Sequence, residues 1–173
     1  ALAHGRTDTG FEYAGERDVL RVLRGVQKFY AVQSNRVYLI GISMGGAGAW
    51  QIGTHYPDLF AGIAPINGQA DWFSFWHSQY DRPPRGQLPR HIETLIALNN
   101  PVDLAGNLSN LYSYSQASKH GFLGTSHTQK MVNVLEKVKA PFDTHVSSSR
   151  LGHYIYWRPD CWQAVANDGT GRS

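Results

Sequence analysis

Apolar residues recur at helical spacing in two stretches of the chain. In the first, Glu16 and Asp18 occupy the opening turn, where acidic side chains stabilise a helix. The second opens with Ser126 and Gln129, which have the spacing of a capping box. The apolar positions are Val19, Leu20, Val22, Leu23, Val26 and Tyr30 in the first stretch and Met131, Val134, Leu135 and Val138 in the second. The pattern predicts two amphipathic helices, each packing one face on a sheet.

Short runs rich in β-branched and aromatic residues predict four strands, at residues 36–42, 60–66, 111–116 and 142–147. A further helix is expected between the first two strands, ending near Tyr56 and Pro57 because the residue before a proline disfavours helix. A turn at residues 151–153 and a short aromatic-rich helix from about Trp157 complete the chain. Strands that alternate with helices predict an α/β fold, with a parallel sheet covered on both faces.

Residues 71–91 do not fit this alternation. Aromatic residues crowd the first half of the segment and prolines the second: Trp72, Phe73, Phe75, Trp76 and Tyr80, then Pro83, Pro84 and Pro89. The segment is too irregular for a core element and is interpreted as a long loop or small cap, a kind of connection that is often functional. Its aromatic side chains either line a substrate pocket or form a small core under the loop.

Composition narrows the class of protein. A chain of 173 residues is expected to form one domain, spanning residues 1–173. Hydrophobic residues at 42% and charged residues at 17% exclude disorder, and no apolar run approaches the roughly 20 residues that span a bilayer. The net charge is only +3 and the basic residues are scattered. We therefore expect a soluble globular domain with neither a membrane nor a nucleic acid as partner.

The single cysteine and the first residue say little about location. Cys161 has no cysteine partner within the chain, so an internal disulfide is excluded and the redox compartment stays undecided. Beside Trp162 it is interpreted as a packing residue. Ala1 opens neither a signal-like segment nor a chain with an initiator methionine, and is interpreted as a processing or cloning boundary.

The first predicted strand stops on Ser43 and turns at once into a helix. Gly41 and Gly45 flank this serine, as expected where side chains would collide with a tight turn that pushes the hydroxyl out of the sheet. The arrangement is typical of the nucleophile elbow of a serine hydrolase. The alternative is a glycine-rich turn that only packs closely, or that holds an anion at the helix N-terminus.

A nucleophilic serine needs a histidine to take its proton. His153 is the best placed, because it follows a late strand, sits in a turn after Gly152 and lies C-terminal to Ser43. Other histidines are interpreted as surface or packing residues: His4, His55, His77, His91, His127 and His145. None has the spacing of a metal site, so we expect no metal and no cofactor.

Together these residues resemble prolyl-oligopeptidase-like and feruloyl-esterase-like α/β-hydrolases. The resemblance covers most of residues 4–157, through the runs 4–6, 16–20, 36–46, 56–61, 100–105, 126–135 and 152–153. It implies a Ser-His-acid hydrolase that acts on esters or, as a weaker expectation, on peptide bonds. In that scheme Ser43 is the nucleophile, His153 the general base and the backbone N–H of Met44 one oxyanion donor.

The acid of the triad departs from the family pattern. Residues 116–123 match the stretch that carries the acid, and His120 stands in the acid's place. An imidazole cannot stabilise a histidine cation as a carboxylate does, so the triad is incomplete as written. Asp71, just beyond the second strand, is the alternative acid. Asp103 is a weaker candidate, and Asp143 lies at the wrong end of its strand.

The front of the chain departs as well. The resemblance implies several strands before Gly5 and a second oxyanion donor from that region, so this chain matches the C-terminal catalytic portion only. An exposed sheet edge and apolar surface should then self-associate or dock the missing N-terminal segment.

Two functional hypotheses follow. The first is a cofactor-free serine carboxylesterase that takes a small-molecule ester, its specificity set by Trp72, Phe75 and Trp76. The second is a non-catalytic α/β-hydrolase-like module, with a degraded triad, that serves binding or scaffolding.

Overall fold

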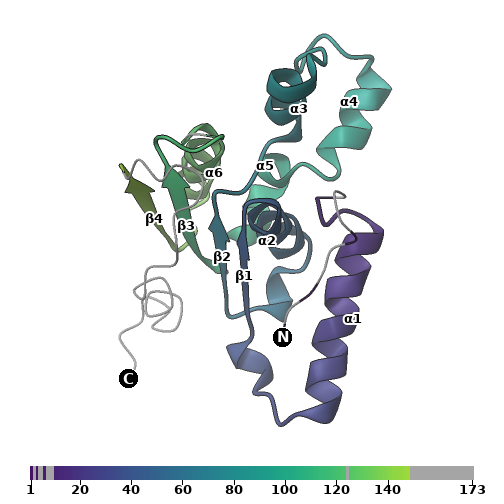
Figure 1. The fold of residues 1–173 in the computed structure, drawn as a ribbon, viewed down its shortest axis with the longest axis vertical. Helices are drawn as coiled ribbons and strands as arrows, with labels where there is room; N and C mark the ends of the chain where they lie inside the picture. The colour runs from purple at the N-terminus through teal and green to yellow at the C-terminus, as the bar shows by residue number, and fades with distance from the viewer. Residues whose placement is uncertain (2, 4–5, 7–9, 124, 149–173) are drawn as a thin grey trace.

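A four-stranded parallel sheet forms the centre of the molecule (Figure 1). The computed structural model describes residues 1, 3, 6, 10–123 and 125–148. The strands are β1 (Tyr38–Ile42), β2 (Gly62–Ile66), β3 (Tyr112–Ser118) and β4 (Phe142–Ser147), in the spatial order β1-β2-β3-β4. All four predicted strands are therefore confirmed. β3 runs two residues further than predicted, to the residues that match the family's acid segment.

Three predicted helices are confirmed, as α1 (Ala14–Phe29), α2 (Met44–His55) and α6 (Ser126–Lys137). The prediction of a capping box at the start of α6 is wrong. Thr125 is the N-cap and Ser126 lies inside the first turn, where its hydroxyl donates to the carbonyl of Leu123 at 3.2 Å. Shorter elements that the pattern did not predict are α4 (Arg90–Ala97), α5 (Pro101–Leu104) and three 3-10 turns, at Ser34–Arg36, Pro57–Leu59 and Ala105–Leu108.

The interpretation of residues 71–91 as an irregular segment is wrong for its first half, which forms helix α3 (Trp72–Tyr80). With α4 it makes a helical hairpin that projects beyond the sheet, at the end where β2 leads into α3 (Figure 1). The helix escaped detection because it spans only nine residues and is rich in aromatic side chains, so its apolar run could not be told from a loop or strand by periodicity.

The core lies on one face of the sheet. The larger cluster of buried apolar side chains unites α1, α2, α6 and the strands, with Trp50, Ile63 and Met131 at its centre. α2 approaches the sheet closely: a Cβ on Gly53 would lie 2.8 Å from a side-chain carbon of Ile63. A second cluster holds strand residues alone, namely Tyr38, Ile40, Ala64, Tyr112 and Tyr114. Within the described residues, helices thus cover one face, and the expected second cover is not tested. No helix in this part of the chain has the length and apolarity to cross a membrane.

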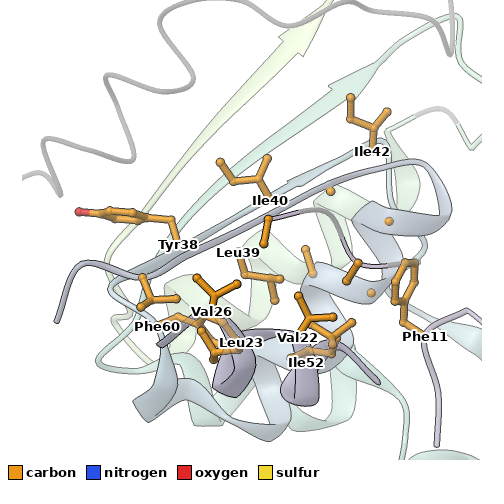
Figure 2. Close-up of a pocket in the computed structure, with 18 of the residues that line it drawn as sticks. Phe11, Val22, Leu23, Val26, Tyr38, Leu39, Ile40, Ile42, Ile52 and Phe60 are labelled. Atoms are coloured by element: carbon orange, nitrogen blue, oxygen red, sulfur yellow. The ribbon is translucent and has the colours of Figure 1, made fainter. Parts of the chain in front are cut away.

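Strand β1 forms one edge of the described sheet. Its Val37 carbonyl and Ser43 N–H bond to the β2 side, at 2.7 Å to the Ala61 N–H and 2.8 Å to the Ile66 carbonyl. Because backbone groups alternate in direction along a strand, those of residues 38, 40 and 42 point away from β2. An apolar groove of about 560 Å³ lies between α1, β1 and α2. Figure 2 shows side chains of α1, Val22 and Leu23 among them, beside this groove.

Candidate active site

Ser43 stands between the end of β1 and the first residue of α2. Its backbone has φ 59° and ψ −119°, a conformation that costs a non-glycine residue on the order of 1–3 kcal/mol. A hydrogen bond from its N–H to the Ile66 carbonyl, at 2.8 Å, holds the turn against the end of β2. The side chain is half-buried. This is the strained strand-to-helix turn that the sequence predicts.

The glycines around Ser43 differ in what they permit. A Cβ on Gly41 would lie 1.9 Å from the backbone oxygen of Gly45, so only glycine fits there. The same expectation for Gly45 is wrong, since a Cβ placed on it would have no described atom within 4 Å apart from its chain neighbours and the backbone of its own helix. The crowded position is Gly46, whose Cβ would meet the Ile66 carbonyl oxygen at 2.6 Å. The sequence showed this glycine but not the neighbour that it must avoid.

Met44 is the first residue of α2. The N–H groups in the first turn of a helix have no partner within the helix, and the helix dipole favours negative charge at this end. The helix ladder begins with the Ala47 N–H, which donates to the Ser43 carbonyl at 3.0 Å. The N–H of Met44 is thus positioned, by its place in the chain, beside the hydroxyl-bearing residue.

His120 lies two residues beyond the end of β3 and is exposed. Its N–H donates to the Ser118 hydroxyl at 3.3 Å, within a turn that closes with a bond from Gly121 to the Ser118 carbonyl. In a parallel sheet the carboxyl ends of the strands share one edge, so His120 lies at the same edge as Ser43. His153, the predicted base, falls outside the described residues.

Asp71 follows β2 at the same edge and is the N-cap residue of α3. Its carboxylate is buried and forms an ion pair with Lys130 of α6. Ser74 donates to the carboxylate at 2.7 Å and Asn100 donates at 3.3 Å. Burial alone would raise the pKa of Asp71, but the hydrogen bonds from Lys130, Ser74 and Asn100 outweigh it and hold the pKa below its usual value. Asp71 is therefore ionised and already paired.

Two histidines expected at the surface or in packing prove to be tied into the fold. His55, on α2, pairs with Glu16 of α1 at 2.5 Å, and this hydrogen bond raises the pKa of His55. His127, on α6, is buried, and its Nδ1 accepts the N–H groups of Ala70 and Asp71. Because burial penalises the cation, the pKa of His127 falls to about 4. No group of His, Cys, Asp and Glu side chains within the described residues could hold a metal ion.

The three aromatic residues expected to bind substrate lie on α3 with unequal exposure. Trp72 is 6% exposed, and its ring nitrogen donates to the Asn99 carbonyl at 3.1 Å. Trp76 stacks on Trp72, with ring centroids 5.9 Å apart. Phe75 and Trp76 are half-buried. Burial thus supports a packing role for Trp72, while the other two retain accessible surface.

A parallel sheet that carries a serine at positive φ between a strand and a helix defines the α/β-hydrolase class. The chain belongs to the prolyl oligopeptidase family, whose model matches residues 13–155. No curated protein matches the chain.

Solved structures share the fold at low sequence identity. A putative dipeptidyl aminopeptidase IV from Bacteroides ovatus superimposes with a TM-score of 0.67 at 16% identity, over 87% of this chain. An S-formylglutathione hydrolase from Staphylococcus aureus gives a TM-score of 0.62 at 17% identity, over 88% of this chain. A ferulic acid esterase gives 0.60 at 18% identity, over 85% of this chain. Esterases and peptidases therefore both share this fold.

The chain spans only part of these proteins. It covers 21% of the aminopeptidase, 59% of the S-formylglutathione hydrolase and 57% of the ferulic acid esterase. The described sheet is accordingly a partial α/β-hydrolase fold.

Proposed function

We propose that this protein is a serine esterase that cleaves small carboxylic esters through an acyl-enzyme on Ser43. The positive φ of Ser43, between β1 and α2, is the observation that carries the proposal. An α/β-hydrolase places its nucleophile at such a turn, where the hydroxyl is exposed at the top of the sheet and the helix N-terminus can face the developing oxyanion.

The chemistry follows from the roles of three groups. Ser43 Oγ attacks the ester carbonyl as His153 accepts its proton, and the N–H of Met44 binds the oxyanion of the tetrahedral intermediate. The intermediate collapses as His153 returns the proton to the departing alcohol, which leaves Ser43 acylated. Water, deprotonated by His153, then releases the carboxylic acid and restores the serine.

Esters rather than peptides are proposed because the acid slot holds His120. The amine that leaves when a peptide bond is cleaved must be protonated as it departs. This step requires more of the histidine and its acid partner than the departure of an alcohol from an ester does. We expect p-nitrophenyl acetate to be hydrolysed and an aminoacyl p-nitroanilide to be left intact. Steady-state rates with both substrates, for the native chain and Ser43→Ala, test this. Amide cleavage faster than ester cleavage would reverse the assignment.

The groove beside β1 is the proposed seat of the second oxyanion donor. Its lining includes Ile42 and Gly45, on either side of Ser43, so a parallel strand filling the groove would end near the elbow. Open space around Gly45 supports room for such a segment. The occupant is proposed to be a further strand, supplied by a missing N-terminal segment or, without it, by self-association.

Val22 of α1 lines this groove, and Val22→Lys should weaken any association, because a buried ammonium is costly to desolvate. We expect light scattering of the native chain to show assembly that rises with concentration and falls in Val22→Lys. The matched control is Gln27→Lys, which adds the same charge at an exposed position of α1. A native chain that stays monomeric at every concentration would contradict association through this edge.

Phe75 and Trp76 are proposed to border the acyl group, since flat apolar walls bind aromatic or medium-chain acids well. Phe75→Ala and Trp76→Ala should change the ratio of rates between short and bulky p-nitrophenyl esters. Trp72→Ala should instead lower stability, by about 3–5 kcal/mol for a buried tryptophan. If every change leaves the ratio untouched and only lowers the melting temperature, the cluster serves as core.

A second candidate function is a non-catalytic binding or scaffold module. The exposed His120 in the acid slot is the observation that favours it. Such a module would keep the elbow geometry and show no ester turnover that depends on Ser43.

A further inference from the structure

A short backbone segment, residues 67–71, connects β2 to α3 and touches the nucleophile elbow; we refer to it as the support segment. It starts directly after Ile66, whose carbonyl accepts the Ser43 N–H. Within it, a Cβ on Gly68 would lie 2.2 Å from the carbonyl carbon of Gly46, in the first turn of α2. The two backbones are in direct contact, with no side chain between them. A shift of the support segment must therefore move the start of α2.

The other end of the support segment is held by α6. His127 is 5% exposed, and its Nδ1 accepts two backbone N–H groups, from Ala70 at 3.3 Å and from Asp71 at 3.2 Å. A ring nitrogen that accepts carries no proton, so the imidazole is neutral with its proton on Nε2. One side chain thus satisfies two buried amides that would otherwise be costly.

Lys130, one turn further along α6, holds the same end through charge. Its ammonium donates to the Asp71 carboxylate and, at 2.9 Å, to the Ser74 hydroxyl. Ser74 in turn donates to Asp71 at 2.7 Å. Residues three apart on a helix lie on one face, so His127 and Lys130 both contact the C-terminal end of the support segment.

We propose that His127 and Lys130 are positioning residues for the nucleophile elbow, acting through the support segment. The part that concerns catalysis rests on the proposed function, because it takes Ser43 as the nucleophile. Neither residue has a role in the acyl-transfer steps, and the contacts run from α6 to residues 70–71, then to Gly68, and from there to Gly46.

The charge state of His127 makes its contact with the support segment sensitive to acid. The groups that face the ring are Asp71, which favours its cation, Lys130, which opposes it, and Phe75 of α3, with ring centroids 6.4 Å apart. Burial outweighs the attraction to Asp71 and lowers the pKa of His127 to about 4. An unfolded histidine titrates at about 6.5, so this site loses stability as pH falls from about 6.5 to about 4.

The test combines hydrogen–deuterium exchange with the rate at which a fluorophosphonate labels Ser43. His127→Leu removes the acceptor, while His127→Asn retains one at a similar reach; Lys130→Met removes the charge. Lys137→Met, at an exposed position of α6, is the matched control. His127→Leu and Lys130→Met should each speed exchange at residues 67–74 and 44–47 about tenfold and slow labelling by a similar factor. His127→Asn and Lys137→Met should change neither, and His127→Asn should flatten the loss of melting temperature between pH 6.5 and 4.

Unchanged exchange at residues 67–74 and 44–47, or faster exchange spread evenly over the chain, would overturn the proposal. Should His127→Leu fail to fold, Lys130→Met carries the test with its Lys137→Met control. If the native chain is not labelled at all, the proposed function fails, and the exchange at residues 44–47 still decides whether α6 positions the elbow.

Discussion

Replacing His120 by aspartate is expected to raise the hydrolysis of an activated ester by up to about ten-thousand-fold. In a well-studied Ser-His-Asp enzyme, loss of the aspartate costs roughly that factor, because the histidine is no longer held in the right tautomer and its cation is no longer stabilised. His120 follows β3, where the family resemblance implies the acid, and its exposure leaves room for a smaller carboxylate. Steady-state turnover of p-nitrophenyl acetate measures the gain.

Asp71→Asn is the companion variant, because Asp71 is the alternative acid. Its carboxylate is paired with Lys130 and accepts hydrogen bonds from Ser74 and Asn100. We therefore expect Asp71→Asn to lower turnover by no more than about tenfold, the effect of loosening the support segment. Lys130→Met is the control, because it breaks the same ion pair without touching the carboxylate.

The pair of variants separates the two acids. If Asp71 has taken over the triad role, Asp71→Asn abolishes turnover, Lys130→Met does not, and His120→Asp is nearly neutral. If His120 fills the true slot, His120→Asp raises turnover, and Asp71→Asn matches Lys130→Met. Activity that responds to neither His120→Asp nor Asp71→Asn would show that the assignment of the triad is wrong.

The loss of turnover caused by Ser43→Ala should depend on the residue at position 120. In an enzyme with a complete triad, removing the serine costs on the order of a million-fold in turnover, and removing the acid alone costs on the order of ten-thousand-fold. If His120 leaves the triad without its acid, about ten-thousand-fold of this turnover is already lost, and Ser43→Ala should lower turnover by only about a further hundred-fold. In the His120→Asp background, the same change should cost about a million-fold.

The matched control is Ser126→Ala, at an exposed serine of α6 whose hydroxyl donates to the nearby Leu123 carbonyl. It should leave turnover unchanged in both backgrounds. Equal losses from Ser43→Ala in both backgrounds would mean that the residue at position 120 does not cooperate with the serine.

Strands β1 and β2 could be predicted because they are nearly continuous apolar runs, the pattern of strands buried in a parallel sheet. β2 (Gly62–Ile66) is buried throughout, and the apolar run that begins at Phe60 predicted it. β3 and β4 could be predicted from their aromatic and β-branched residues, which alternate with polar ones. Helix α3 was missed because it is short, at nine residues, and its run of aromatic side chains is ambiguous between helix, strand and loop. α4 (Arg90–Ala97), by contrast, has no buried residue. It is short and directly follows a proline-rich stretch, so its apolar pattern was not recognised as a helix.

The site was predictable where one residue's local geometry decides it. Ser43 and Gly41 both belong to one tight turn, and the motif that predicts this turn consists of five consecutive residues. Two other features join segments far apart in the chain. They are the contact of Gly46 with Gly68 and the hydrogen bonds of His127 with residues 70–71. Spacing along the sequence carries no signal for such contacts, although a glycine directly after a buried strand is a hint of close approach.

The proposed esterase activity depends most directly on Ser43 as a covalent nucleophile. A fluorophosphonate transfers its phosphonyl group to an activated serine oxygen and releases fluoride, so intact mass spectrometry of the folded chain detects the adduct. The predicted result is one adduct on the native chain, mapped to Ser43 after digestion, and none on Ser43→Ala. No adduct on the folded native chain, or an adduct that survives Ser43→Ala, would contradict it.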